Sequence, residues 1–246
     1  MSRGLTGPAA PAVRTARAAP ARPLAAGVTT AVLLGGRDGC RGLRQRRLRL
    51  TAGARFSAMA AGLGESWFVT GGAGSLETPE SGAVPLREGV AVWLRRGTRY
   101  RCRADAGGAL KVLATAVFAG SAGDDTGPAT RVAALEDCEP EHTGDREFRV
   151  LLGSGPAGRL AITQFAGLIP PGRAPDHHHA YNEVVHVLAG RGVVHLGDAD
   201  AAIGPGTSVY LPPFQPHCLE NTGSELLRVL GVFHPAGSPA AKNPAT

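Results

Sequence analysis

Short apolar segments separated by Gly- and Pro-rich turns follow one another along most of the chain. In the second half they read RLAITQFAGLI, EVVHVLAG, GVVHLG, TSVYLPP and LLRVLGVF. Each contains a run of roughly 4–9 residues, which is the usual length of a strand. No stretch keeps the apolar period of about 3.6 residues that an amphipathic helix requires over three turns. The pattern predicts an all-β protein built from antiparallel strands.

The first half repeats this pattern at a nearly constant offset. The segment from Glu65 to Gly72 aligns with the segment from Glu183 to Gly190 at an offset of 118 residues. Two further matches, at an offset of 117, align residues 86–89 with 203–206 and residues 112–113 with 229–230. Three matches in nearly one register predict two copies of one β domain, over residues 28–118 and 147–235.

The segments outside the two predicted copies differ in composition from the copies. Residues 1–27 contain Ala, Pro and Arg but no acidic residue, which is typical of a disordered tail. Residues 119–146 are rich in Gly, Ala and acidic residues and predict a linker, and residues 236–246 predict a C-terminal tail. The prolines of the first segment disfavour a transit peptide, and residues 28–34 are too short for a secretory core. We therefore expect a cytoplasmic protein.

The positive charge is confined to the front of the chain. The net charge is +6, but residues 1–60 hold eleven arginines and one acidic residue, so the remainder carries −4. Residues 1–55 contain no aromatic residue on which bases could stack, which argues against nucleic-acid binding. No apolar run approaches the ~18–20 residues of a membrane-spanning helix. The four cysteines are scattered, without a CxxC pair, and predict free thiols in a reducing compartment.

All eight histidines follow residue 140, and their spacing predicts a metal site. Alternate residues of a strand face the same side, so His177 and His179 project together while His178 points away. Glu183 keeps the same parity, and His217 follows a Pro-rich turn 34 residues later. Three imidazoles and a carboxylate suit Fe, Mn, Ni, Cu or Zn and leave positions open for water or substrate.

The joint spacing resembles the two signature motifs of the cupin family. The motifs read here His177-x-His179-x3-Glu183-x6-Gly190 and Gly204-Pro205-Gly206 followed by His217-x3-Asn221. The resemblance covers both repeats and implies two tandem cupin jelly-roll β-barrels, that is, a bicupin. It also implies one divalent metal per chain, held in the second barrel by His177, His179, Glu183 and His217. The family pattern differs in one loop length after Gly172 and at Gly204, neither of which supplies a ligand.

The first copy retains one of the four implied ligands. Glu65 aligns with Glu183, but the repeat places Met59, Ala61 and Tyr100 where the three histidines stand in the second copy. A carboxylate and a thioether cannot hold a divalent metal against water, so we expect a metal-free first barrel. It would cover sheet edges or build a dimer face. The alternative is a small-molecule pocket lined by Met59, Trp67, Trp93 and Tyr100.

The remaining polar residues receive structural roles, with one exception. Tyr181 shares the parity of the ligands, so it is a candidate proton donor beside Glu183, which is the other candidate catalytic residue; packing at a hairpin end is the alternative. We expect His178, His186, His195 and His234 to be structural and Cys218 to be a buried thiol. The residues expected to wall the pocket are apolar: Val185, Val187, Tyr210, Phe214 and Phe233.

The predicted site restricts the reaction type without naming a substrate. Our first hypothesis is a dioxygenase-type oxidoreductase acting on a small aromatic or carbonyl-bearing molecule. An isomerase, lyase or decarboxylase is the alternative, and a non-enzymatic binding bicupin is the third possibility. Exposed sheet edges further predict a homodimer.

Overall fold

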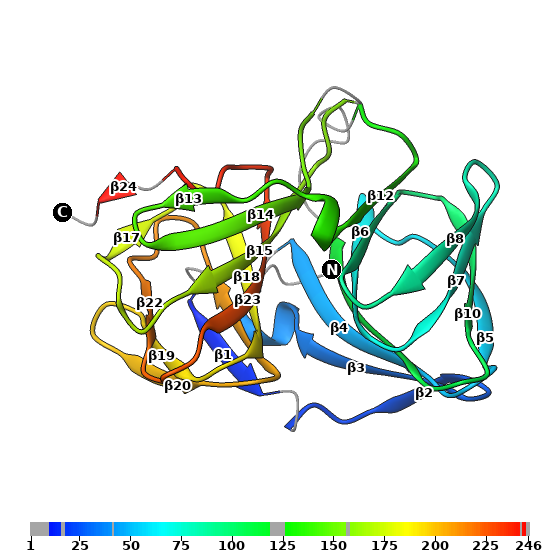
Figure 1. Ribbon diagram of the computed structural model, residues 1–246, viewed down its shortest axis with the longest axis horizontal. Coiled ribbons are helices and arrows are strands. Elements are labelled where there is room, and N and C mark those ends of the chain that lie inside the picture. Colours follow the sequence, from blue (N-terminus) through cyan, green and yellow to red (C-terminus); the bar gives the residue numbers. More distant parts are fainter. Residues whose placement is uncertain are drawn as a thin grey trace, which may run out of the picture.

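The strands that the sequence predicts form two similar halves, which lie side by side (Figure 1). The computed structural model describes residues 10–15, 18–40, 42–118, 126–155 and 158–241, and the backbone of residues 243–244. Over these residues the only helical elements are two short 3-10 turns, η2 (Gly36–Asp38) and η4 (Leu135–Asp137). The all-β prediction is confirmed. None of the described helical turns is long and apolar enough to cross a membrane.

The N-terminal half contains a large and a small antiparallel sheet. In spatial order the large sheet consists of β12 (Thr130–Ala134), β9 (Val90–Arg95), β6 (Gly64–Gly71), β11 (Leu110–Val117), β4 (Leu43–Leu50), β3 (Val28–Leu34) and β2 (Arg22–Ala25). The small sheet consists of β5 (Arg55–Met59), β10 (Arg99–Ala104), β7 (Ala73–Thr78) and β8 (Gly82–Arg87).

The C-terminal half has the same two sheets. Its large sheet consists of β1 (Ala12–Thr15), β21 (Thr207–Leu211), β18 (Asn182–Ala189), β23 (Leu227–His234), β15 (Thr163–Ile169), β14 (Arg146–Leu152) and β13 (Glu141–Thr143). Its small sheet consists of β16 (Gly172–Arg173), β22 (Cys218–Asn221), β19 (Gly192–His195) and β20 (Asp200–Ile203). A short pair, β17 (His177–His178) and β24 (Asn243–Pro244), lies beside it. The two strand orders correspond element by element, so the predicted duplication is confirmed.

Each half lends its first strand to the other half. β1 precedes the N-terminal half in sequence but pairs with β21 of the C-terminal half, from Ala12 opposite Tyr210 to Thr15 opposite Thr207. β12 precedes the C-terminal half but pairs with β9 of the N-terminal half. In Figure 1 the blue β1 lies among the yellow and orange strands, and the green β12 lies among the cyan ones. This exchange ties the two halves together through backbone hydrogen bonds.

The exchanged strands correct the predicted boundaries. A disordered tail over residues 1–27 is wrong for residues 12–15 and 22–25, which form β1 and β2; residues 1–9 lie outside the described residues. The predicted linker over residues 119–146 contains β12 and β13, so it is a structural part of both halves. Both segments have few large apolar side chains, so their sequences do not predict strands. They are held in the sheets by backbone pairing.

The predicted C-terminal tail is also held by contacts. The backbone of β24 pairs with β17, and the carbonyl of Ser238 accepts a hydrogen bond from the Tyr181 hydroxyl at 2.9 Å. The carbonyl of Ala241 accepts one from Nδ1 of His179 at 3.1 Å. Residues 236–241 therefore belong to the folded C-terminal half.

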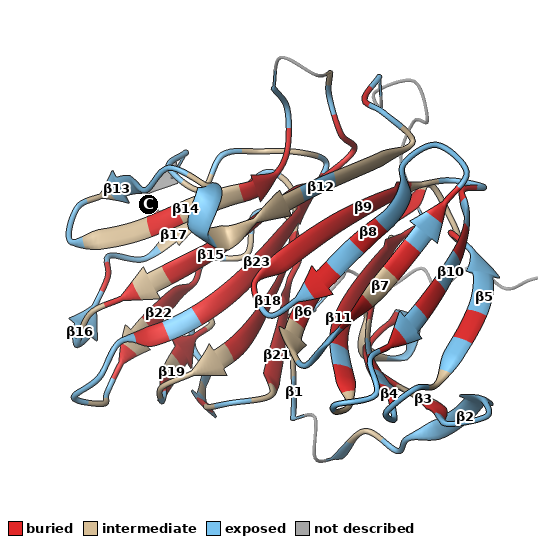
Figure 2. Ribbon diagram, turned by 45° about the vertical axis from the view of Figure 1, so that its right-hand side comes forward, coloured by how far each residue is buried: buried red, intermediate tan, exposed pale blue. Residues whose placement is uncertain are grey.

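Alternation along the large sheets places buried side chains on both faces of each sheet. On β6, Trp67 and Val69 point into the N-terminal half, whereas Phe68 points to the other half. On β18, Val185 and Val187 point into the C-terminal half, and Val184 points to the other half. Phe68 and Val184 thus belong to one buried cluster between the two large sheets. Figure 2 shows the long central strands of both halves as the most continuously buried part of the chain. The interface between the halves is therefore a hydrophobic core.

Two buried glutamines at equivalent repeat positions place hydrogen bonds in this interface. Gln45 on β4 accepts a bond from Ser208 Oγ at 2.6 Å, and Gln164 on β15 donates one to Ser66 Oγ at 3.3 Å. Nδ1 of His186 bonds to Ser208 Oγ at 2.8 Å. Buried polar groups need such partners, so these bonds restrict how the sheets can slide against each other.

Deleting residues 1–15 should lower the melting temperature, because β21 loses its neighbour and Val13 loses its packing against the C-terminal core. A loss of about 2 kcal/mol would lower it by roughly 4–8 °C in a chain of this size. Calorimetry of this variant should be compared with deletion of residues 1–9, which removes none of the described contacts. Equal melting temperatures for the two deletions would contradict the exchange.

Acidification should weaken the interface through His186. Burial, followed by the charge of Arg47, lowers the pKa of His186 from 6.5 to about 4. Between these values the unfolded chain takes up a proton that the folded chain refuses, so stability falls as pH drops from 6.5 toward 4, by up to about 3 kcal/mol. Denaturant unfolding at pH 7.5 and 4.5 should show a smaller pH difference for His186→Gln than for the wild type. An unchanged difference would rule out this contribution.

Candidate metal centre

The four residues implied as ligands converge inside the C-terminal half. His177 begins β17, His179 follows it, Glu183 lies near the start of β18, and His217 immediately precedes β22. A backbone bridge joins His177 to His217, with N–H to carbonyl distances of 3.0 and 2.9 Å. One nitrogen from each of the three rings lies within 4.8 Å of the others. The strand parity and the Pro-rich turn therefore bring together the histidines that the sequence singled out.

Backbone carbonyls orient all three imidazoles in the same way. Nδ1 of His177 bonds to the carbonyl of Pro175 at 3.3 Å, Nδ1 of His179 to that of Ala241 at 3.1 Å, and Nδ1 of His217 to that of Gln215 at 2.8 Å. A carbonyl only accepts, so each Nδ1 carries the proton and each neutral ring presents the lone pair of Nε2. Ligand histidines of metal sites are oriented by such partners.

Glu183 adds a buried oxygen that has no hydrogen-bond partner within the described part of the chain. Its Oε2 lies 3.7 Å from Nε2 of His179 and 3.5 Å from Nε2 of His217, and the residue is 5% exposed. Burial by itself raises the pKa of Glu183, but His217 and the other two rings outweigh burial and lower it. An ionised oxygen held among Nε2 lone pairs fits a cation, since a buried charge otherwise lacks compensation.

The pKa values of the rings favour neutral imidazole at two of the three positions. Burial lowers the pKa of His177 to about 4 and also lowers the pKa of His179. Burial acts on His217 in the same direction, but the adjacent Glu183 raises its pKa above the ordinary value. His217 is therefore the ring that takes up a proton first as the pH falls, and this proton competes with a metal.

A cavity of about 80 Å³ lies against these residues. Its other walls are largely apolar, and of the predicted wall residues Val185 and Phe233 line it. Arg146, at the start of β14, is the cation in its lining, and sequence reasoning missed it because the residue lies in the predicted linker. Arg146 donates to the carbonyl of Leu219 at 2.8 Å, and burial lowers its pKa. Among the described residues no carboxylate forms an ion pair with it.

Three of the predicted wall residues lie elsewhere. Tyr210 belongs to the core between the halves, and its hydroxyl donates to Asn182 at 2.7 Å. Val187 packs in the hydrophobic core of the C-terminal half and does not line this cavity. Phe214 is 64% exposed. These positions were wrong because β21 faces the other half at Tyr210 and because the turn before His217 lies at the surface.

Tyr181 packs on the site. Its ring stacks on that of His179, with centroids 5.0 Å apart and planes 10° apart, and its hydroxyl donates to the Ser238 carbonyl. Burial, followed by the charge of Glu183, raises its pKa. These contacts describe a positioning residue, and a role as proton donor stays a prediction.

The other polar residues lie away from the three ligand nitrogens. His186 faces the other half, His195 bonds to Asp200 and Glu220, and His234 bonds to the carbonyl of Ala161. Cys218 is fully buried, and burial raises its pKa to about 11. All four cysteines are free thiols.

In the N-terminal half a guanidinium accompanies the remaining carboxylate. Glu65 is 2% exposed and accepts hydrogen bonds from Arg46 at 2.9 Å, from Trp67 Nε1 at 3.2 Å and from the backbone of Ala61 at 3.2 Å. Arg46 occupies the repeat position of Phe165, which lines the cavity of the other half. Tyr100 lies against Trp67, and Met59 is 58% exposed. An internal cation thus compensates the buried charge of Glu65.

The alternative pocket in the first half is not formed. Trp67 packs inside the N-terminal half, whereas Trp93 packs in the core between the halves, so the sheet separates them. Met59 lines only a shallow surface depression with Tyr100. The four residues therefore do not enclose a common cavity.

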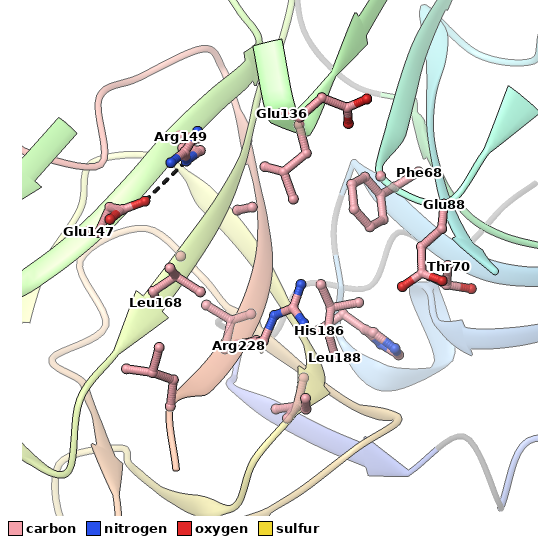
Figure 3. A pocket seen from close by; sticks show the side chains of 18 of the residues that line it. Phe68, Thr70, Glu88, Glu136, Glu147, Arg149, Leu168, His186, Leu188 and Arg228 are labelled. Atoms are coloured by element: carbon pink, nitrogen blue, oxygen red, sulfur yellow. Dashed lines mark hydrogen bonds and ion pairs between the residues drawn. The ribbon is translucent and has the colours of Figure 1, made fainter. Parts of the chain in front are cut away.

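A second hollow, a cleft of about 820 Å³, lies between the halves (Figure 3). Phe68, Thr70 and Glu88 line it from the N-terminal half, facing His186 and Arg228 of the other half. The cleft contains none of the four implied ligands. It is larger than the cavity at the histidines but lacks a converging donor set.

Comparisons with known proteins agree with this architecture. The cupin domain family matches residues 166–233. A segment of 58 residues is 33% identical to the uncharacterized protein MJ1618 of Methanocaldococcus jannaschii, and it covers 24% of this chain and 46% of that protein. The match thus spans less than half the length of this curated relative.

Solved structures resemble the whole chain at low sequence identity. A point mutant of Bacillus subtilis oxalate decarboxylase superposes with a TM-score of 0.77 at 15% identity, covering 97% of this chain and 80% of that one. Protein Ylba from E. coli gives 0.76 at 11% identity, covering 95% and 94%. A putative glyoxylate-induced protein from Pseudomonas aeruginosa gives 0.72 at 16% identity, covering 88% and 84%. These likenesses establish the fold.

Residues 166–233 of this chain thus match the cupin domain family, and the whole chain has two jelly-roll halves, the fold of the solved structures that it resembles. Its second half carries the cupin motifs, and its first half keeps only Glu65 of the ligand set.

Replacing Arg46 with Met should destabilise the N-terminal half by roughly 3–5 kcal/mol, because it leaves the buried carboxylate of Glu65 without a cation. The double variant Arg46→Met/Glu65→Gln should recover much of this loss, since an amide keeps hydrogen-bond acceptors without the charge. Arg101→Met breaks an exposed ion pair with Glu77 and should cost less than about 1 kcal/mol. Urea unfolding measures all three. A single variant as stable as the double one would show that Arg46 does not neutralise Glu65.

Proposed function

We propose that this bicupin is a metal-dependent enzyme whose second half binds one divalent transition metal and acts on a small carboxylate- or carbonyl-bearing molecule. The observation that carries the proposal is the common orientation of the three rings. Each presents Nε2, and those of His179 and His217 lie 3.7 and 3.5 Å from a buried Glu183 oxygen that has no hydrogen-bond partner among the described residues. His177, His179, His217 and Glu183 would hold the metal.

The donor set suits Fe, Mn, Ni, Cu or Zn. Manganese has particular support, because the oxalate decarboxylase that resembles this chain is described by its Mn(II) centres. When bound, the metal supplies a Lewis acid or a redox centre beside the substrate. The chain itself orients the ligands through backbone carbonyls and surrounds the site with apolar walls that exclude water.

The size of the cavity limits the substrate. A volume of about 80 Å³ is far below the ≈ 300–1,000 Å³ of sites for drug-sized ligands. This supports a molecule of a few heavy atoms and disfavours the aromatic substrate that the sequence suggested. Among the described residues no carboxylate forms an ion pair with the guanidinium of Arg146, which fits a carboxylate of the substrate.

Two reaction types remain to be separated. Dioxygenase chemistry is the hypothesis that the sequence supports through its cupin resemblance. Decarboxylation or a related lyase reaction is favoured by the small cavity, by Arg146 and by the likeness to oxalate decarboxylase. The homodimer and the cytoplasmic location expected from the sequence are part of the proposal as well.

Elemental analysis should find one metal per chain after loading, since one half has the four donors. His217→Ala removes a ligand and should weaken binding more than the loss of an orienting partner does, that is, by more than about 100-fold. Affinity should also fall below neutral pH as His217 is protonated. Glu65→Gln should leave the metal content unchanged. Two metals per chain, or full occupancy in His217→Ala, would refute the proposed site.

The same loaded proteins, wild type and His217→Ala, should be assayed with small keto acids, hydroxy acids and dicarboxylates. Oxygen uptake in proportion to product identifies a dioxygenase, whereas CO₂ release without net oxygen uptake identifies a decarboxylase. Turnover should fall together with metal content. Metal binding without any turnover over the panel would favour the non-enzymatic bicupin.

A further inference from the structure

We propose that the C-terminal segment, residues 235–241, belongs to the metal centre. Its Ala241 carbonyl fixes the tautomer of His179, and its Pro239 forms one wall of the cavity. The inference rests on the proposed function, because it assigns His179 to the metal. The position of this segment after the second repeat predicts a tail, and the match to the cupin domain family ends at residue 233, before the segment begins.

The segment follows a defined path across the mouth of the C-terminal half. The backbone N–H of Gly237 donates to Thr163 Oγ1 at 3.2 Å. The carbonyl of Ser238 accepts from the Tyr181 hydroxyl at 2.9 Å and from the N–H of Ala241 at 3.1 Å. These bonds form a turn that is held at both ends, so the carbonyl of Ala241 is fixed in position.

His179 depends on this turn in a way that the other two rings do not. His177 and His217 each bond to a carbonyl two residues earlier in their own loops. The partner of His179 is Ala241, 62 residues further along the chain. Only for His179, therefore, can the orienting partner be removed without altering the loop that carries the ligand.

Tyr181 joins the segment to the ring it orients. The tyrosine ring stacks on His179 on one side and lies against Gly237 on the other. A Cβ at position 237 would lie 2.3 Å from Cε1 of Tyr181, so a larger residue cannot be accommodated without moving the segment. Pro239 lines the cavity itself. The segment thus supplies a wall of the cavity as well as the carbonyl.

Truncation separates the contributions of this segment. A chain ending at residue 239 lacks the Ala241 carbonyl but keeps Pro239 and the peptide carbonyl of Ser238 that Tyr181 contacts. A chain ending at residue 242 lacks β24 but keeps the Ala241 carbonyl within a peptide bond, so it is the matched control. The imidazole ¹⁵N shifts of the metal-free proteins report the tautomer of His179. Competition with a chromophoric chelator measures the affinity for Co²⁺, and far-ultraviolet circular dichroism checks the fold.

The chain ending at 239 should lose the preference for the Nδ1–H tautomer at His179 and bind Co²⁺ about 10- to 100-fold more weakly, the effect typical of losing an orienting partner. The chain ending at 242 should resemble the full chain in both measurements. If the shorter chain does not fold, Gly237→Ala in the full chain should change the tautomer and the affinity in the same direction. Unchanged ¹⁵N shifts and affinity in the folded variants would overturn the inference.

Failure of the proposed function gives a different result. If the full chain does not bind Co²⁺, the metal site is wrong, whereas the ¹⁵N comparison still decides whether Ala241 sets the tautomer of His179.

Discussion

The packing of the two large sheets against each other is the constraint on which the rest of the structure depends. Every central strand serves two cores at once, since alternate residues face the interior of its own half and the opposite sheet. A shift of one residue in β6 or β18 would exchange the two faces of that strand and bury Glu65 or Glu183 between the halves. The strand register that buries the apolar interface therefore also places both carboxylates inside their own halves. The exchanged strands β1 and β12 extend the same two sheets.

The two halves meet the same electrostatic problem with different cations. Each has a glutamate at an equivalent position, deep inside its jelly roll, where an uncompensated charge is costly. In the N-terminal half Arg46 donates to Glu65. In the C-terminal half the equivalent position is Phe165, and the imidazoles of His179 and His217 lie beside Glu183 instead. The presence of a guanidinium in one half explains why that half needs no metal to tolerate its buried acid.

Main-chain carbonyls fix the orientation of the three histidine rings in the candidate site. The three rings are oriented by the carbonyls of Pro175, Gln215 and Ala241, and these carbonyls are positioned by a loop, a turn and the C-terminal segment. A side-chain partner could be exchanged by substitution, whereas a carbonyl is held by the path of the backbone. The geometry at the histidines is therefore a property of the fold around them.

The sequence by itself determined the β architecture and the duplication, which follow from local patterns such as strand parity and the repeat offset. The resemblance to the cupin motifs, and not a local rule, implied that His177, His179, Glu183 and His217 lie together. The sequence could not determine that β1 and β12 exchange halves, since AVRT and TRVAA carry little hydrophobic signal and their pairing depends on a backbone edge supplied from far along the chain. Arg46, Arg146 and Ala241 escaped sequence reasoning for the same reason. Each acts on a group far from it in sequence, and only the tertiary structure brings such pairs into contact.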